Sequence, residues 1–228
     1  MLNRRLAEAQ PSGVVLEHAT VPAMTVGPLA LNDASTLAIP IPLDGILGYD
    51  FFLGHVVHVD YAGHRVEVMT PQAAQAAFTD PRNAVIGASF DEGIPLVRAA
   101  FGAAAGDRFA LDTGSDSLYV FEPFAVRYAH EIDTRWTPWS FGSGSRRHLT
   151  EEAEYLEGSV VMGARRVASF QIGPAAFRDM TVGVQLPNGR ADAIDIPLDG
   201  VIGTDEMSSF EWWFDYDGGR IALRRNNR

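Results

Sequence analysis

The sequence predicts a mainly β fold, and three observations carry this prediction. The chain has 228 residues, of which 46% are apolar and 21% charged, a balance that supports a sizeable buried core. Its 22 glycines and 13 prolines favour many short strands joined by turns over long helices. Short apolar segments recur between these turns, and one block of them occurs twice.

The duplicated block indicates an internal repeat. Ile41–Gly48 reads Ile-Pro-Leu-Asp-Gly-Ile-Leu-Gly and returns 155 residues later as Ile196–Gly203, with Val-Ile in place of Ile-Leu. The same offset relates Asp60-Tyr61 to Asp215-Tyr216. Two copies are too few for a solenoid. We therefore expect one complete copy over about 83–223, preceded by a first copy that holds only the corresponding last half.

The elements follow in order from apolar runs and turn residues. In the first copy, strands are expected at 14–16, 23–26, 56–61 and 65–68, with a hairpin turn at Ala62-Gly63. The Ala- and Gln-rich segment 69–78 predicts a short helix, and 79–83 is a candidate linker. In the second copy, strands are expected at 94–101, 109–111, 160–162, 168–172, 180–186, 211–214 and 221–223, with a short helix within 118–130.

Composition excludes several kinds of chemistry. The formal net charge of −11 disfavours a nucleic-acid partner, because phosphate binding needs a positive surface. The absence of cysteine removes disulfides and thiolate ligands, and the absence of lysine removes a phosphate-loop or Schiff-base lysine. No run is long enough to span a membrane, and the first ten residues lack the apolar segment of a signal peptide.

Sequence motifs exclude further classes of enzyme. No Gly-x-Ser-x-Gly occurs, and Gly142-Ser143-Gly144 begins a dinucleotide pattern that Arg147 interrupts where the third glycine belongs. His55, His58 and His64 lie close together, but no carboxylate pattern accompanies them, so we expect neither a metal nor a cofactor.

The remaining candidate site is Arg108–Ser115, where an apolar strand runs into Asp112-Thr113-Gly114-Ser115. A carboxylate directly after a buried strand is costly unless hydrogen bonds support its charge. The hydroxyls of Thr113 and Ser115 and the backbone N–H groups around Gly114 can give that support. We therefore expect the loop to hold the Asp112 carboxylate in a fixed place.

The order apolar-apolar-Asp-Thr-Gly-Ser resembles the active-site loop of the aspartic proteases, the pepsin and retropepsin superfamily. The layout of the second copy is similar to that of the bacterial retropepsin-like proteases, and its late part occurs twice. The resemblance implies a retropepsin-like β-barrel lobe over residues 83–228. It also implies the C-terminal half of a preceding lobe over 1–75, with a linker at 76–82.

By the same resemblance, Asp112 is one of two aspartates that hold a water molecule and share one proton. Thr113 would brace the paired loops, Gly114 would allow close backbone approach, and Ser115 would hydrogen-bond the carboxylate. The resemblance further implies a flap at Phe141, Gly142, Ser143 and Gly144, and a structural loop behind the site at Val201, Ile202 and Gly203.

The implied function is that of an aspartic endopeptidase acting on a peptide or protein substrate. A working site needs two Asp-Thr-Gly loops, and this sequence has one. The second could come from sequence before Met1 or from a homodimer, although the first half-lobe would obstruct the homodimer's interface. The alternative is a catalytically inactive peptide-binding or scaffold module. The resemblance also implies an exported or periplasmic protein, but no segment of this sequence specifies the compartment.

Overall fold

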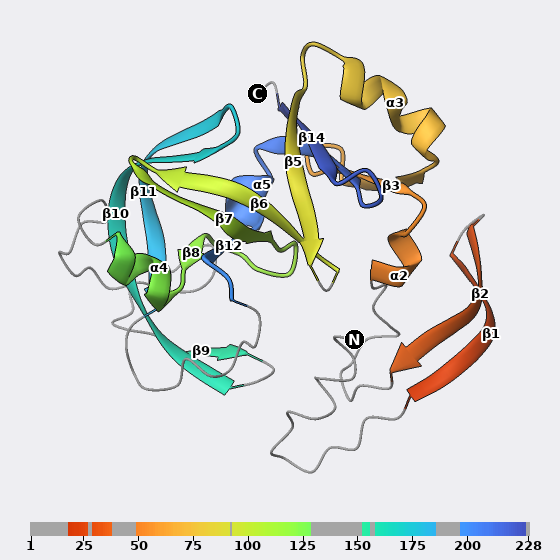
Figure 1. Cartoon of the computed structure of the whole chain (residues 1–228), viewed down its shortest axis with the longest axis horizontal. Coiled ribbons are helices and arrows are strands. Elements are labelled where there is room, and N and C mark those ends of the chain that lie inside the picture. The colour runs from red at the N-terminus through yellow and green to blue at the C-terminus, as the bar shows by residue number, and fades with distance from the viewer. Residues whose placement is uncertain are drawn as a thin grey trace. The chain divides into compact units, whose positions relative to one another are not determined.

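The computed structural model describes residues 18–26, 29–37, 49–91, 93–128, 152–155, 158–185 and 197–226 (Figure 1). The chain divides into two compact units, Met1–Leu53 and Gly54–Arg228. In the first unit, β1 (His18–Val26) and β2 (Leu29–Leu37) form an antiparallel hairpin, and the short helix α2 spans Tyr49–Phe52.

Six strands of the second unit close into a barrel. In order around the ring they are β6 (Ile94–Phe101), β7 (Ala104–Leu111), β12 (Gly200–Ile202), β8 (Tyr119–Val120), β11 (Ala175–Gln185) and β10 (Gly158–Ile172). The ring closes because β10 also pairs with β6. A short strand, β9 (Glu152–Tyr155), pairs with β10 outside the ring. The predicted mainly β fold with a barrel is confirmed.

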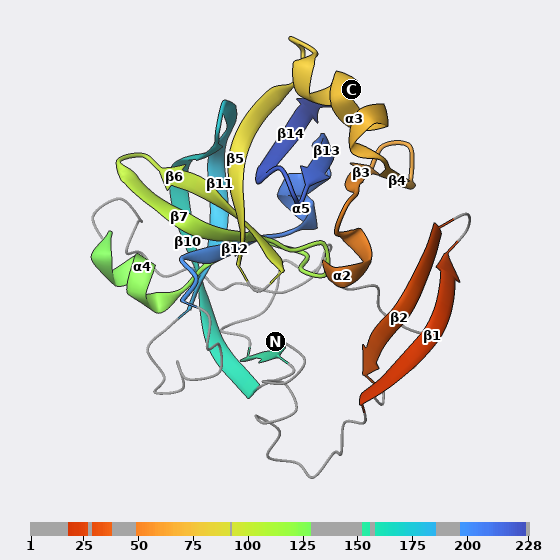
Figure 2. The same cartoon turned by 45° about the vertical axis from the view of Figure 1, so that its right-hand side comes forward.

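A sheet of five neighbouring strands continues from this barrel. Its order is β4 (Arg65–Met69), β3 (Val56–Asp60), β13 (Phe210–Asp215), β14 (Arg220–Arg225) and β5 (Ala84–Asp91). The first half of β5, residues 84–87, pairs with β14, and the second half, residues 88–91, pairs with β6. The single strand β5 therefore belongs to both the sheet and the barrel (Figures 1 and 2).

Within its described residues, the second unit has three short helices: α3 (Pro71–Thr79), α4 (Glu122–Arg127) and α5 (Thr204–Met207). Helix α3 corresponds to the helix expected at 69–78. It begins where Thr70 accepts a hydrogen bond from the Ala73 N–H through its Oγ1 (3.3 Å), with Pro71 in the first turn. The buried Ala74 packs it against Val56 and Trp213 of the sheet. The predicted linker, 76–82, comprises the end of α3 and the turn before β5.

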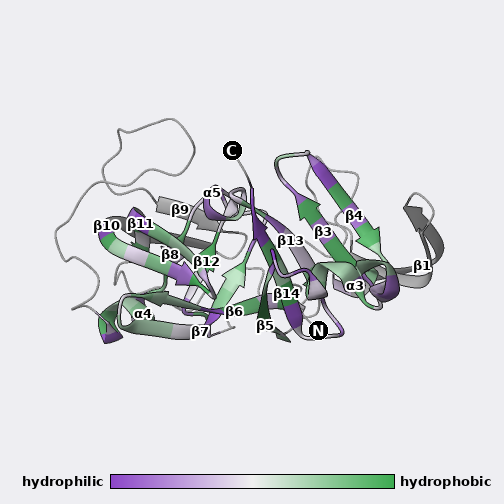
Figure 3. Ribbon diagram, turned by 90° about the horizontal axis from the view of Figure 1, so that it is seen from above, coloured by the Kyte–Doolittle hydropathy of each residue, from purple (hydrophilic) through white to green (hydrophobic). Residues whose placement is uncertain are grey.

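The barrel core is built from phenylalanine rings. Phe101, Phe109, Phe124 and Phe170 are each at most 1% exposed. The ring of Phe101 lies 4.9 Å from that of Phe170, and the rings of Phe109 and Phe124 meet edge to face at 5.2 Å. Hydrophobic residues predominate along β6 and β12 (Figure 3). This core fixes the end of β7, which carries the candidate site.

Candidate active site

Asp112 follows the last residue of β7, where the strand leaves the barrel core. Phe109, Ala110 and Leu111 are buried, whereas the side chain of Asp112 is exposed. The Gly114 N–H donates to Oδ1 of Asp112 (2.8 Å), and the Ser115 N–H donates to its backbone carbonyl (3.2 Å). The loop thus turns back on the aspartate and supplies a donor to its charge while leaving the carboxyl group accessible.

The repeated Val201-Ile202-Gly203 segment lies directly beside this loop. Its strand, β12, pairs parallel with β7, so that Val201 lies opposite Ala110 and Ile202 opposite Leu111. The Asp112 N–H donates to the Ile202 carbonyl (3.1 Å). A Cβ on Gly203 would lie 2.4 Å from the Ser117 backbone nitrogen. Only glycine fits at this contact, so the segment packs directly against the Asp112 loop.

The chain beyond Gly203 holds the far side of the loop. The Thr204 N–H donates to the Ser115 carbonyl (2.8 Å), and the Asp205 N–H donates to the Asp116 carbonyl (2.9 Å). These two backbone bonds and the Asp112–Ile202 bond bind the loop at both ends. The position of the Asp112 carboxyl is therefore set by main-chain hydrogen bonds between β7, β12 and α5.

The hydroxyl of Ser115 has a different partner from the one expected. Ser115 was expected to hydrogen-bond the carboxylate of Asp112, but its Oγ donates to the Ser117 carbonyl (3.2 Å) instead. The Gly114 N–H is the donor that reaches the Asp112 carboxylate. The side chain of Thr113 is exposed. The flap candidates Phe141, Gly142, Ser143 and Gly144 lie outside the described residues.

Tyr61 is a neighbour of the site that sequence reasoning missed. It follows β3, and its hydroxyl lies 4.0 Å from Sδ of Met207 in α5. Burial of the phenol raises the pKa of Tyr61, and the nearby Asp112 carboxylate raises it further. The available signal was the repeated Asp-Tyr pair, which marked Tyr61 as part of the duplicated block but not as a neighbour of Asp112.

Glu206 is a buried carboxyl group behind the loop. It lies in α5, is 7% exposed, and has no hydrogen-bond partner for Oε2. Burial raises the pKa of Glu206 to about 7, and the adjacent Asp205 carboxylate adds to the rise. Near neutral pH this side chain is therefore partly protonated.

The described residues show no metal site. No group of three or more potential ligands among His, Asp and Glu gathers within the described ranges. His58, one of three histidines close in sequence, instead stacks on Trp213 with 4.4 Å between ring centroids. Its Nδ1 lies 2.9 Å from Oε2 of Glu67.

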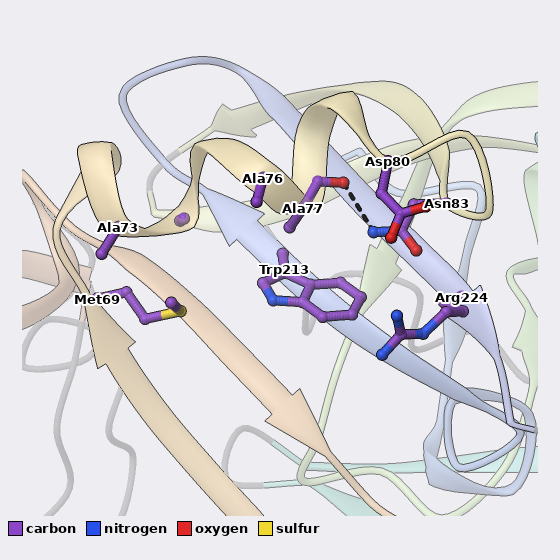
Figure 4. Close-up of a pocket in the computed structure, with 9 residues that line it drawn as sticks. Met69, Ala73, Ala76, Ala77, Asp80, Asn83, Trp213 and Arg224 are labelled. Carbon is purple, nitrogen blue, oxygen red and sulfur yellow. Dashed lines mark hydrogen bonds between the residues drawn. The ribbon is translucent and has the colours of Figure 1, made fainter.

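A cavity of about 220 Å³ lies under α3, away from the Asp112 loop (Figure 4). Trp213 lies opposite alanines of the helix, Arg224 lies on the side of Asp80 and Asn83, and Asn83 Nδ2 donates to the Ala77 carbonyl (2.7 Å). None of its lining residues belongs to the loop.

Elsewhere in the described ranges, no helix combines the length and apolar character needed to cross a bilayer.

No protein-family model and no curated protein matches the chain. Among solved structures, it is similar to a retropepsin-like aspartic protease from Rickettsia conorii, with 16% identity and a TM-score of 0.39 over 62% of this chain and 90% of that one. It is also similar to conglutin gamma, a 7S globulin from lupine seeds, with 11% identity and a TM-score of 0.44 over 92% of this chain and 66% of that one. Because both TM-scores are below 0.5, neither similarity assigns a function.

Proposed function

We propose that this chain supplies one of the two aspartates of an aspartic-type endopeptidase, and that Asp112 is this aspartate. The observation that carries the proposal is the placement of its carboxyl group. It stands exposed at the end of a buried strand, accepts the Gly114 N–H, and is fixed by the backbone bond to Ile202. A carboxylate that is both accessible and held in position suits general acid–base catalysis.

Peptide hydrolysis needs a second carboxyl group beside the first. Two adjacent carboxyl groups share one proton, because both cannot ionise at short range. The ionised group takes a proton from water as the water oxygen bonds to the peptide carbonyl carbon. The protonated group gives its proton to the carbonyl oxygen. The C–N bond of the intermediate then breaks. The nitrogen takes the proton held by the first carboxyl group, and a hydroxyl of the intermediate returns a proton to the second.

In this mechanism the other loop residues are positioning residues. Gly114 supplies the N–H that supports the charge of Asp112, and Thr113 is proposed to brace the loop against its counterpart. The backbone carbonyl of Ser115 anchors the loop to Thr204. Ile202 and Gly203 support the loop from behind, and the segment 141–144 is proposed as the flap over the bound peptide.

The domain proposal has one incomplete lobe followed by one complete lobe. Residues 1–75 would form the C-terminal half of a first lobe, 76–82 the linker, and 83–228 the complete lobe. The repeat behind this division gains support from the helices that follow each repeated block, since α2 starts 155 residues before α5. The second aspartate would come from sequence upstream of Met1 or from a second copy of this chain.

The test is peptide cleavage at acidic pH by the longest natural form of the protein. The change Asp112→Asn should lower kcat/KM by at least about 10²-fold, the usual contribution of one general acid–base group. Asp116→Asn is the matched control, because it removes an exposed carboxylate from the same loop. A pepstatin-type inhibitor should block the wild-type protein.

Unchanged cleavage by the Asp112→Asn variant would show that Asp112 is not catalytic. Binding of the inhibitor by the wild-type protein without any cleavage would favour the inactive peptide-binding module instead. The observation that favours the inactive peptide-binding module is that the sequence contains only one Asp-Thr-Gly.

A further inference from the structure

The hairpins β3–β4 and β13–β14 have equivalent turns. In the first, the Gly63 N–H donates to Oδ1 of Asp60 (2.8 Å), and in the second the Gly218 N–H donates to Oδ1 of Asp215 (2.9 Å). The next residue is left-handed in both, with φ of 51° at His64 and 60° at Gly219. Each turn residue lies 155 positions from its equivalent.

The strand pairing within the two hairpins is equivalent as well. Asp60 lies opposite Arg65 in the first hairpin, and Asp215 lies opposite Arg220 in the second. Both pairs form ion pairs, at 3.7 Å and 2.8 Å respectively. The β3–β4 hairpin is therefore a structural copy of the β13–β14 hairpin.

The two hairpins pair with each other about a local two-fold axis. Strands β3 and β13 are antiparallel, with His58 opposite Trp213 at the centre. These two residues hold equivalent positions in the repeat. On one side of them Asp60 lies opposite Glu211, and on the other Val56 lies opposite Asp215, the equivalent of Asp60. This isologous register is the one that two identical subunits would adopt.

The junction where β3 pairs with β13, called the seam below, nevertheless has different side chains on its two strands. The His58 ring is 5% exposed and stacks on Trp213 with 5° between the ring planes. Its Nδ1 faces Glu67 of its own hairpin, and its Nε2 lies 3.4 Å from Oε2 of Glu211 across the seam. A second copy of β13 in place of β3 would put tryptophan against Trp213 and leave Glu211 without the imidazole.

Pairing with β3 also occupies the edge of β13 that a second copy would need. A strand has two hydrogen-bonding edges, and in β13 one pairs with β14 and the other with β3. The hairpin also brings its own Tyr61 to α5, where the hydroxyl lies beside Met207. A second subunit that docked through β13 would have to displace both features.

We infer that the β3–β4 hairpin stands in for a second subunit, so that the partner carboxylate of Asp112 is not supplied by another copy of this chain. It comes from a polypeptide segment that carries its own Asp-Thr-Gly and completes the first copy of the repeat. This inference rests on the proposed function. It selects between the two sources of the second aspartate that the proposed function leaves open.

The first test is sedimentation of the wild-type chain over a wide range of concentrations. The expected result is the mass of one chain throughout, with no self-association when a pepstatin-type inhibitor is added. A concentration-dependent dimer that cleaves peptides in an Asp112-dependent manner would overturn the inference and support the proposed function. Cleavage of peptides by the monomer alone would also overturn it, because the second carboxylate would then lie within this chain.

The second test uses disulfides, and the absence of cysteine makes introduced thiols the only ones present. Asp60→Cys combined with Glu211→Cys places thiols at opposed positions across the seam. Asp60→Cys combined with Arg65→Cys is the matched control, since that pair lies within one hairpin. After oxidation, both variants should give monomers with an internal disulfide.

Covalent dimers from the seam variant, with monomers from the control, would show that β13 pairs with another copy and would overturn the inference. The disulfide test and the mass measured by sedimentation need no catalytic activity. These two measurements therefore still test the inference if the chain proves not to be an endopeptidase. Failure of the inference can thus be told apart from failure of the proposed function.

Discussion

At high pH the buried carboxyl group of Glu206 lowers the free energy of unfolding, and replacing Glu206 by glutamine should remove most of this loss. Its pKa is about 7 in the folded protein, against an ordinary value of 4.5. Well below pH 4.5 the group is protonated in both folded and unfolded chains, and its ionisation adds no cost to folding. As pH rises to about 7, the unfolded chain releases its proton first, so the free energy of unfolding falls. At about 1.4 kcal/mol per pH unit, the loss amounts to about 3 kcal/mol.

Urea unfolding followed by tryptophan fluorescence measures this effect at a series of pH values. The quantity to compare is the free energy of unfolding of the wild type minus that of Glu206→Gln. This difference should fall by about 3 kcal/mol between about pH 4 and about pH 8. The constant cost of burying an amide at this site shifts the difference equally at every pH and does not affect its slope.

Asp116→Asn is the control, because it removes an exposed carboxylate from the neighbouring loop. This variant keeps Glu206, so its free energy of unfolding should still fall between about pH 4 and about pH 8. Parallel pH profiles for the wild type and Glu206→Gln would refute the reasoning, because they would mean that the carboxyl of Glu206 ionises as readily in the folded chain as in the unfolded one.

Three further substitutions, and one control, test the close packing, the barrel core and the cap of α3. Gly203→Ala should destabilise the chain by about 1–3 kcal/mol because its Cβ would meet Ser117, whereas Gly87→Ala, which has open space around it, should cost less than about 1 kcal/mol in the same urea assay. Phe101→Ala should cost about 3–5 kcal/mol by calorimetry, because the ring is 1% exposed in the barrel core; a loss below 1 kcal/mol would contradict that burial. Thr70→Ala should lower the free energy of unfolding by about 1 kcal/mol, because α3 loses its cap. Thermal unfolding followed by circular dichroism tests this, and a midpoint equal to that of the wild type would argue against the cap.

Local patterns in the sequence were enough to predict the mainly β fold. The turn at Ala62-Gly63 lies between β3 and β4 as expected, because the turn residues act on their own neighbours. The helix expected at 69–78 is α3, where Thr70 and Pro71 provide a start signal that depends only on adjacent residues. The strand expected to run into Asp112 is β7.

Features that depend on distant pairing could not be predicted in the same way. Tyr61 approaches Asp112 only because β3 pairs with β13, about 150 residues further along the chain, and no local pattern encodes that contact. The Ser115 hydroxyl donates to the Ser117 carbonyl, and this bond depends on the backbone path of the loop, which the residue order alone does not specify. Glu206 sits in a four-residue helix, too short for periodicity to reveal which side is buried.

Strand β5 links the unfolding of the sheet to that of the barrel. Because its first half completes the sheet and its second half completes the barrel wall, neither part can lose β5 without exposing the other. Amide hydrogens on β14 and β6 should therefore exchange with solvent at a common slow rate, through one shared opening event. We expect the sheet and the barrel to unfold together, because both depend on β5.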